Sequence, residues 1–278
     1  MFKNCSSLTN IDVLSYWDVS NVKNLDGMFS GCSLLLNIRS LQNWNLSNCE
    51  DLSNIFYGCK SLNDISPLKN WNISNVKRLL NSFRECEELS DIRSLSYWNT
   101  SNVEDLSNFF RGCKNLQIIE PLKKWDISKC INLQDTFSEC KINDISPLSR
   151  WDVSNCKDFS YMFYEGNNFT NVSQLNKWNV SKSENFMFMF GKCLKLSNIE
   201  GLNKWNVKQC EKFSGMFSSC PLLVDISPLK DWDISNGKDF TGMFSGCHIS
   251  TIPKKIIKWK EKFLKKNLNP EAFKGMFD

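Results

Sequence analysis

The side chains with the strongest intrinsic chemistry in this 278-residue chain are its 13 cysteines and its single histidine, His248. Cysteines in such number hold disulfides or metal ions in small scaffolds. No Cys-x-x-Cys pair occurs, however, and one histidine does not supply a repeated zinc site. Asp and Ser residues recur together, but no histidine stands near them to activate a serine as a nucleophile. We therefore expect no catalytic, cofactor-binding or metal-binding residues and no enzymatic activity.

The cysteines occupy two regular columns. Nine follow a regularly spaced Phe by three residues: Cys5, Cys32, Cys59, Cys86, Cys113, Cys140, Cys193, Cys220 and Cys247. Four follow a Trp by five residues, where other units carry Val: Cys49, Cys130, Cys156 and Cys210. A position that accepts both Cys and Val requires a small apolar side chain. In the unit that begins at Trp151, Gly166 replaces Cys and Phe169 replaces the usual Leu, as expected for volume compensation in a core. We interpret the cysteines as free, buried thiols.

The columns belong to a repeat that covers most of the chain. The tryptophans recur at a constant interval, except for one step that is a single residue shorter: Trp17, Trp44, Trp71, Trp98, Trp125, Trp151, Trp178, Trp205, Trp232 and Trp259. A fixed period of this length is typical of arrays in which each unit buries its apolar face against its neighbours. We predict a leucine-rich-repeat-like α/β solenoid of about ten 27-residue units over residues 1–250.

Each unit is expected to hold one helix and one strand. In the second unit the apolar residues Cys49, Leu52, Ile55 and Phe56 follow steps of three and four, which predicts a helix of about ten residues between Ser47 and Gly58. After this helix we expect an irregular leg and then a short strand.

The irregular leg and the strand are expected from proline and from alternation. Pro67 and its equivalents should keep the leg out of a helix. Trp71 and Ile73 alternate with polar residues, which indicates a strand. Strands stack at about 4.8 Å and helices at about 8–10 Å, so the array should bend with strands on the concave face. The Phe-linked Cys column would then lie at the helix end, beyond the roughly 7 Å limit for a disulfide.

Charge and hydropathy exclude several partner classes. Residues 251–278 carry eight Lys and three acidic residues, a balance of +5, which leaves the first 250 residues at −1. A nearly neutral array does not suit nucleic acid, and no apolar run has the length of a membrane span. Residues 251–278 are interpreted as the last coil with an amphipathic capping helix. At the other end, Leu8, Ile11 and Leu14 are expected to be exposed on an uncapped coil, which predicts weak self-association.

The residue before each Trp changes from unit to unit within a constant frame, as expected where a solenoid encodes specificity. We predict a partner-binding stripe on the strand face that consists of Tyr16, Tyr97, Lys124, Arg150, Lys177 and Lys204. Its four consecutive basic residues indicate another protein or a surface ligand of acidic character as the partner. The alternative is a solvated stripe balanced by a neighbouring column that includes Asp126 and Asp152.

The repeat resembles a known family. Segments 17–32 (WDVSNVKNLDGMFSGC) and 232–247 (WDISNGKDFTGMFSGC) are similar to the repeat of BspA-like leucine-rich-repeat surface proteins, in particular the bacterial surface protein repeat of mycoplasma lipoproteins. The resemblance covers residues 1–250. It implies a right-handed solenoid and a non-catalytic role in surface adhesion or ligand binding, with no cofactor.

The resemblance leaves the compartment open. It implies a cell-surface or extracellular location, whereas this chain starts without an apolar leader, which favours a cytoplasmic one. The alternative function is therefore an intracellular protein–protein interaction scaffold.

Overall fold

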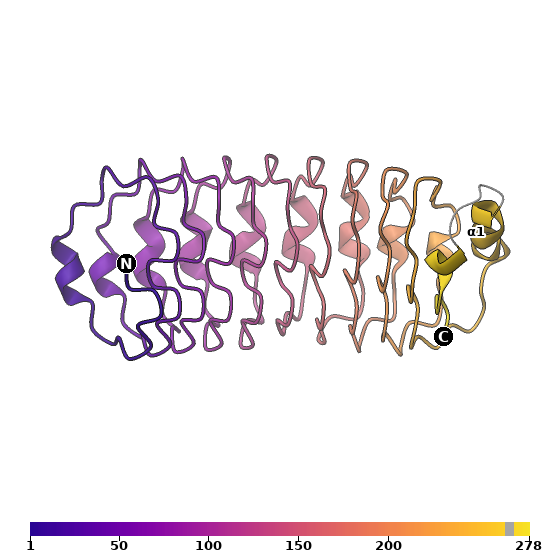
Figure 1. Ribbon diagram of the computed structural model, residues 1–278, viewed down its shortest axis with the longest axis horizontal. Helices are drawn as coiled ribbons and strands as arrows, with labels where there is room; N and C mark the ends of the chain where they lie inside the picture. The colour runs from indigo at the N-terminus through magenta and orange to yellow at the C-terminus, as the bar shows by residue number, and fades with distance from the viewer. Residues whose placement is uncertain (265–269) are drawn as a thin grey trace.

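The computed structural model describes residues 1–264 and 270–278, and they form one elongated array of stacked coils (Figure 1). Each coil takes up one repeat unit, and the two termini lie near opposite ends of the array. The repeat solenoid predicted from the sequence is therefore confirmed. The local structure of each coil differs from the prediction in both of its elements.

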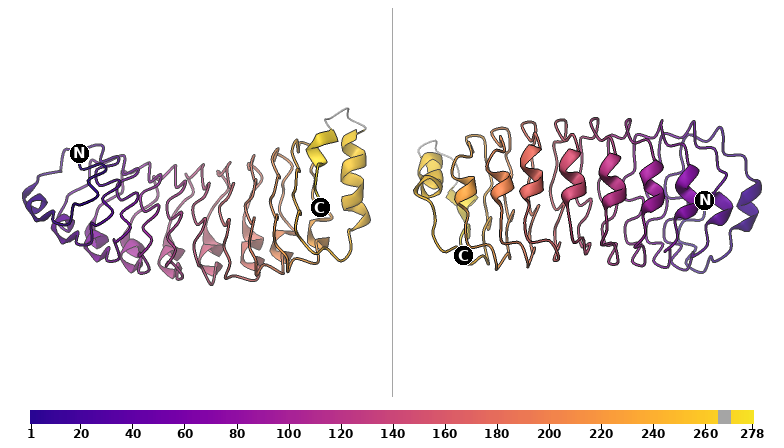
Figure 2. Two further views of the ribbon diagram at one scale, coloured as in Figure 1. Left: turned by 60° about the horizontal axis from the view of Figure 1, so that its bottom comes forward. Right: turned by 180° about the vertical axis from the view of Figure 1, so that it is seen from behind.

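Short 3-10 helices run along one side of the array (Figure 2). Within the described residues, nine of them precede a tryptophan: η1 (Asp12–Tyr16), η2 (Arg39–Leu41), η3 (Ser66–Asn70), η4 (Arg93–Tyr97), η5 (Glu120–Lys124), η6 (Ser146–Arg150), η7 (Ser173–Lys177), η8 (Glu200–Leu202) and η9 (Ser227–Leu229). Four of these helices carry Pro in their first two positions, where its fixed φ favours a helical turn. The expectation that Pro67 keeps this leg out of a helix is therefore wrong.

The leg expected to be an α-helix is instead a series of tight turns. Single-residue parallel bridges join it from coil to coil: Asn24, Asp51, Arg78, Asp105, Asn132, Asp158, Asn185, Lys212 and Asp239. We call residues 51–58 and their equivalents the bridged leg. Asn54 and Gly58 have φ of 55° and 70°, a left-handed backbone that an α-helix does not contain. Successive turns, such as the bond from the Ile55 N–H to the Leu52 carbonyl, also bring apolar residues to one side every three or four positions.

Backbone hydrogen bonds join each bridged leg to the next. The N–H groups of Leu52, Asn54 and Phe56 donate to carbonyls of the following coil, at 3.1, 2.7 and 3.0 Å. The bonded pairs resemble a parallel ladder, but Asn54, itself one of the donors, has a left-handed backbone and prevents a continuous strand.

The strand predicted at Trp71–Ile73 is also absent from the described part of the chain. Trp71 is extended, and the side chains of Trp71 and Ile73 are buried while Asn72 is exposed. The alternation therefore does reflect an extended segment with one inward face, but this segment has no ladder partner. The described residues contain isolated bridges and no longer strand.

The array bends with its 3-10 helices on the outer side, as the left view of Figure 2 shows. Ring spacing explains the bend. The centroids of Phe29 and Phe56, beside the bridged leg, are 5.7 Å apart, and those of Trp44 and Trp71, beside the helices, are 6.3 Å apart. Coils that stack more closely on one side must curve toward it. The concave face is therefore made by the bridged legs and not by the predicted strands.

The tryptophans hold neighbouring coils together through their indole nitrogens. Trp44 Nε1 donates to the Leu14 carbonyl of the preceding coil at 3.0 Å. The same bond, at 2.9 or 3.0 Å, is made by Trp71, Trp98, Trp125, Trp151, Trp178, Trp205 and Trp232. The Leu14 carbonyl also accepts the Trp17 backbone N–H, so both of its lone pairs are used. Phe and Leu have no donor for this position, which explains why Trp recurs.

A similar ladder explains the main cysteine column. Cys59 Sγ lies 3.2 Å from the Phe29 carbonyl of the preceding coil, so the thiol fills a small space and also donates weakly. The same contact is made by Cys32, Cys86, Cys113, Cys140, Cys193, Cys220 and Cys247. All 13 cysteines are free and eleven are buried, as predicted; Cys5 is exposed and Cys247 half-buried. The spacing argument against disulfides is wrong, however, because the column lies beside the closely stacked bridged leg.

The N-terminal coil is better packed than expected. Ile11 and Leu14 are buried, at 2% and 0% exposure, and Leu8 is half-buried. Phe2 stacks on Phe29 at 5.8 Å and closes the coil. The predicted exposure of these aliphatic residues, on which self-association depended, is therefore wrong.

At the C-terminal end an α-helix stands where the repeat would place a 3-10 helix before Trp259. Helix α1 (Lys254–Leu264) contains the buried Trp259. The expected amphipathic helix region extends into residues 265–269, which lie outside the described residues. Helix η10 (Pro270–Phe273) then leads into one more bridged leg, in which the Phe240 N–H donates to the Ala272 carbonyl at 2.7 Å. The sequence FKGMF at 273–277 is similar to FTGMF at 240–244. Because the two segments are further apart than one regular repeat, a search at the regular period misses this similarity.

We predict that the indole ladder contributes measurably to stability. Trp125→Phe removes the N–H that bonds to the Leu95 carbonyl and leaves a small cavity, so it should lower the free energy of unfolding by about 2–4 kcal/mol. Trp17→Phe is the matched control, because Trp17 is 38% exposed and no described coil precedes it; its cost should stay below about 1 kcal/mol. Urea unfolding of both variants measures the difference. Equal costs would contradict a role for the indole bond.

We also predict a steep loss of stability at alkaline pH. Burial raises the pKa of eight thiols: Cys32, Cys49, Cys59, Cys86, Cys113, Cys140, Cys193 and Cys210. Thiols in the unfolded chain titrate at about pH 8.5, so above that pH the folded state holds more protons than the unfolded state. Each thiol should then remove about 1.4 kcal/mol of stability per pH unit. The measurement is urea unfolding between pH 8 and 10.5.

Two variants isolate the thiol contribution from that of other titrating groups. Cys113→Val should reduce the pH slope, because one buried proton is removed while the side-chain volume is nearly kept. Val76→Ala should leave the slope unchanged, because it disturbs the same buried core without removing a thiol. A stability that stays constant through pH 10 would show that the thiols are not buried and protonated.

Candidate functional site

The recurring Asp, Asn and Ser residues form turns. In the coil around Asn72, its Oδ1 accepts the Ser74 N–H at 3.2 Å, and Asp64 does the same for Ser66 at 2.8 Å. This is the Asx turn, for which Asp and Asn serve equally well. The Asp–Ser pairs thus have a structural role at these positions. Among the described residues no group of three or more His, Cys, Asp or Glu gathers at a point where it could hold a metal ion.

The predicted stripe lies on the outer face. Tyr16, Tyr97, Lys124, Arg150 and Lys177 are the last residues of η1, η4, η5, η6 and η7. Lys204 directly precedes Trp205 at the equivalent place in its coil. All six are exposed, which agrees with the prediction. Their predicted location on a concave strand face is wrong, because the leg before each Trp is a 3-10 helix on the outer side of the bend.

The four basic residues of the stripe have no acidic partner. None of them lies within 4 Å of a carboxylate oxygen in the part of the chain that the structure describes. Asp126 and Asp152, the proposed balance, accept the N–H groups of their Asx turns at 3.0 Å and keep their charge, and Asp152 lines one hollow together with Arg150 and Lys177. Stacked Trp rings beside this face are 6.3–6.4 Å apart, so the basic residues repel one another less than at strand spacing. The stripe therefore presents basic side chains to solvent without a direct ion pair.

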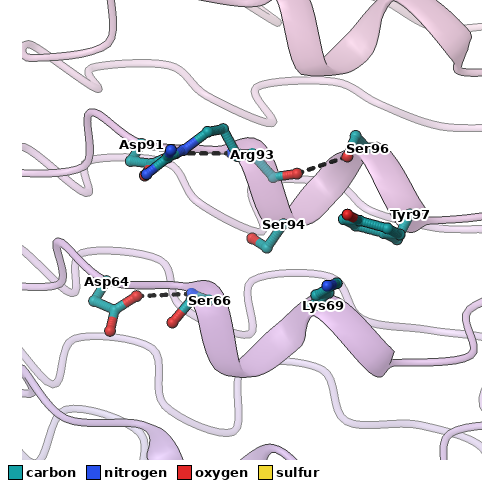
Figure 3. A pocket seen from close by; sticks show the side chains of 8 residues that line it. All are labelled: Asp64, Ser66, Lys69, Asp91, Arg93, Ser94, Ser96 and Tyr97. Carbon is teal, nitrogen blue, oxygen red and sulfur yellow. Dashed lines mark hydrogen bonds and ion pairs between the residues drawn. The ribbon is translucent and has the colours of Figure 1, made fainter.

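A hollow of about 470 Å³ lies beside Tyr97, between η3 and η4 (Figure 3). Lys69 Nζ stands 4.4 Å from the centre of the Tyr97 ring, and Arg93 Nε donates to Asp91 at 2.9 Å. The Ser94 hydroxyl is buried at the floor without a hydrogen-bond partner. The hollow combines an aromatic ring with paired charges, so it can hold a polar side chain but contains no activated nucleophile.

A second hollow, of about 900 Å³, includes Arg150 and Lys177 from the stripe. The Gln174 Oε1 in its wall is buried and has no partner. Gln174, like Ser94, stands at the position where other coils carry Pro. Each hollow therefore lies beside a coil in which a polar residue occupies the proline column.

The bridged face carries an aromatic cluster that the sequence alone did not reveal. We define the aromatic cluster as Tyr161, Tyr164 and Phe188, all half-buried. Tyr161 and Phe188 stack at 5.1 Å with an interplanar angle of 15°. Tyr164 meets them edge-on, at 5.4 and 6.1 Å. These residues lie in the segments expected to be helices. Aromatic residues are common in helices, so the pattern did not single out these three.

Ion pairs surround the aromatic cluster. Arg111 contacts Asp135 at 3.2 Å and Glu139 at 3.4 Å, and Lys192 contacts Glu165 at 2.9 Å. Burial raises the pKa of Asp135, and the Arg111 guanidinium opposes that shift. Unlike the outer stripe, this surface has its charges paired within the protein.

Comparisons with known proteins point to one family. A family model described as "Mycoplasma protein of unknown function, DUF285" matches residues 1–94, 78–199 and 141–259. Among curated proteins, none matches the chain. A leucine-rich-repeat protein from Bacteroides ovatus of known crystal structure is similar over 94% of this chain and 77% of its own, with 14% identity and a TM-score of 0.30. No helix within the described residues is long and apolar enough to cross a membrane.

Proposed function

Because the chain belongs to the Mycoplasma family DUF285, whose repeat fills the whole array, we propose that it is a non-catalytic protein-binding module. The observation that carries this proposal is the row of exposed basic residues on the outer stripe, none of which makes a direct ion pair within the described residues. Four neighbouring coils present Lys124, Arg150, Lys177 and Lys204 to solvent from one position of a rigid frame. An acidic protein surface would complement them and would associate faster through long-range attraction.

The repeat structure of the chain is more consistent with binding than with catalysis. Its recurrent polar side chains are used in turns, and its hollows are open to solvent without a paired nucleophile and base. Specificity would then be encoded by the variable position before each Trp, where Tyr97 and its hollow directly precede the four basic residues. The BspA-like character and the role in adhesion remain part of this proposal and rest on the repeat resemblance.

The alternative is an intracellular interaction scaffold. The 13 free cysteines favour it, because thiols persist in reducing compartments. Buried thiols also survive outside a cell, so location requires a direct experiment. If the chain acts in adhesion, protease added to intact cells of the source organism should degrade it, as detected with an antibody. Degradation only after lysis would identify the scaffold.

Charge reversal tests the stripe. We predict that Lys124→Glu/Arg150→Glu/Lys177→Glu lowers affinity for acidic peptides by about tenfold or more at low salt, with a smaller effect at high salt. The peptides would be selected from a random phage-displayed library on the immobilised protein. A matched control reverses three exposed lysines of other columns, Lys23, Lys60 and Lys182. Equal losses in both triple variants, or none in the first, would exclude the stripe as the binding surface.

A further inference from the structure

The bridged leg has two columns with a left-handed backbone. One contains Gly58 and its equivalents, which include Glu85, Glu139, Glu165 and Lys192. The members of the other, which otherwise holds only Gly, Asn or Asp beside Tyr161 and Phe188, are Gly27, Asn54, Asn81, Asn108, Asp135, Tyr161, Phe188, Gly215, Gly242 and Gly275. Gly adopts this conformation freely and Asn and Asp tolerate it, whereas bulky side chains are strained by it. Tyr161 and Phe188, with φ of 57° and 52°, are therefore the exceptions. Strained residues that persist in a frame are candidates for a functional role.

The neighbouring coils leave space for these rings. A Cβ on Gly215 would lie 2.2 Å from the Phe188 ring, and a Cβ on Gly191 would lie 3.0 Å from both Phe188 and Tyr164. Gly191 stands where other coils carry Ser, Tyr or Arg. The two glycines and the aromatic cluster are therefore complementary, which indicates a built surface and not a single unfavourable residue.

Several ring faces of the cluster are covered. Tyr161 and Phe188 cover one another, Phe188 also lies over Gly215, and Lys192 Nζ stands 5.1 Å from the Tyr164 ring centre. A sugar ring stacks on an open aromatic face, which Phe188 does not offer between Tyr161 and Gly215. Ring edges carry the positive part of the aromatic quadrupole and pack well against another aromatic face.

Charge also restricts the partner. The basic residues beside the cluster are already paired, Arg111 with Asp135 and Glu139 and Lys192 with Glu165. Carboxylates outnumber cations among these five residues, so the cluster does not suit a polyanion. An uncharged ligand leaves these pairs intact.

We propose that the aromatic cluster is a second binding surface, on the concave face, for a protein segment that presents an uncharged aromatic side chain. Tyr, Phe and Arg together are the composition of the cores of protein interfaces. The surface is separate from the basic stripe, which lies on the outer face and favours acidic partners. The proposal rests on the function as a binding module but not on the stripe.

The test uses the same random-peptide selection on the full chain. The double variant Tyr161→Asn/Phe188→Asn places Asn at both positions. Asn81 and Asn108 already occupy the same column, so the variant should fold. Uncharged peptides with Trp, Tyr or Phe should be enriched, and their affinity should fall by at least about thirtyfold in this variant. Tyr57→Ser is the matched control, because it removes a half-buried aromatic residue of the bridged leg outside the cluster, at a position where other coils carry Ser; it should leave their affinity unchanged.

Each other outcome decides against the proposal. Aromatic peptides that bind the double variant as well as the unchanged protein would overturn it, as would enrichment of acidic peptides alone, which would still support the stripe. If no peptide is enriched, both surfaces are excluded. A glycan array that shows binding dependent on Tyr161 and Phe188 would overturn the assignment of the partner to protein. Thermal unfolding of the double variant, with a melting temperature near that of the unchanged chain, establishes that a lost affinity is not a folding defect.

Discussion

The structure depends on the hydrogen-bonded register between successive coils. Backbone N–H groups in each bridged leg donate to carbonyls of the following coil, and an indole N–H donates to a carbonyl of the preceding coil. The shortened unit between Trp125 and Trp151 shows that register takes precedence over residue count. There the Leu133 N–H still donates to the Asp158 carbonyl, and Trp151 Nε1 still donates to the Leu122 carbonyl, although each pair is one residue closer in the chain than its equivalents. The missing residue is absorbed where the chain turns, and both ladders continue.

This constraint determines which side chains are free to vary. Inward positions are restricted to apolar residues and Cys, because each fills a defined space against its equivalent in the next coil. The turn positions are restricted to Asp and Asn. Variation is therefore confined to the ends of the 3-10 helices and to the exposed positions of the bridged leg. The basic stripe occupies the first region and the aromatic cluster the second, so one frame presents two chemically different faces.

Much of this organisation can be predicted from the sequence. The period of the Trp series predicts the solenoid, the exchange of Cys with Val predicts buried thiols, and the variable residue before each Trp predicts an exposed position. The assignment of helix and strand fails because a series of tight turns produces the same three- and four-residue spacing as an α-helix. The signal that distinguishes them is the Gly or Asn in mid-segment at Gly27, Asn54 and Asn81, which a helix disfavours.

That error also concealed the aromatic cluster. Tyr161 and Phe188 are unremarkable on a helix but exceptional in a column that requires a left-handed backbone. The interactions of the stripe could not be predicted either, because the distance from each base to the nearest carboxylate depends on how the coils stack. Sequence periodicity identifies columns, but only the path of the backbone shows which face each column occupies.

The backbone conformation of the bridged leg in solution is the property on which both surfaces depend most directly. NMR chemical shifts of residues 51–59 and 78–86 would measure it in deuterated protein. We expect left-handed values at Asn54, Gly58 and Asn81, with no continuous run of helical shifts between them. An uninterrupted series of α-helical shifts across either segment would contradict the bridged leg and with it the location of the aromatic cluster.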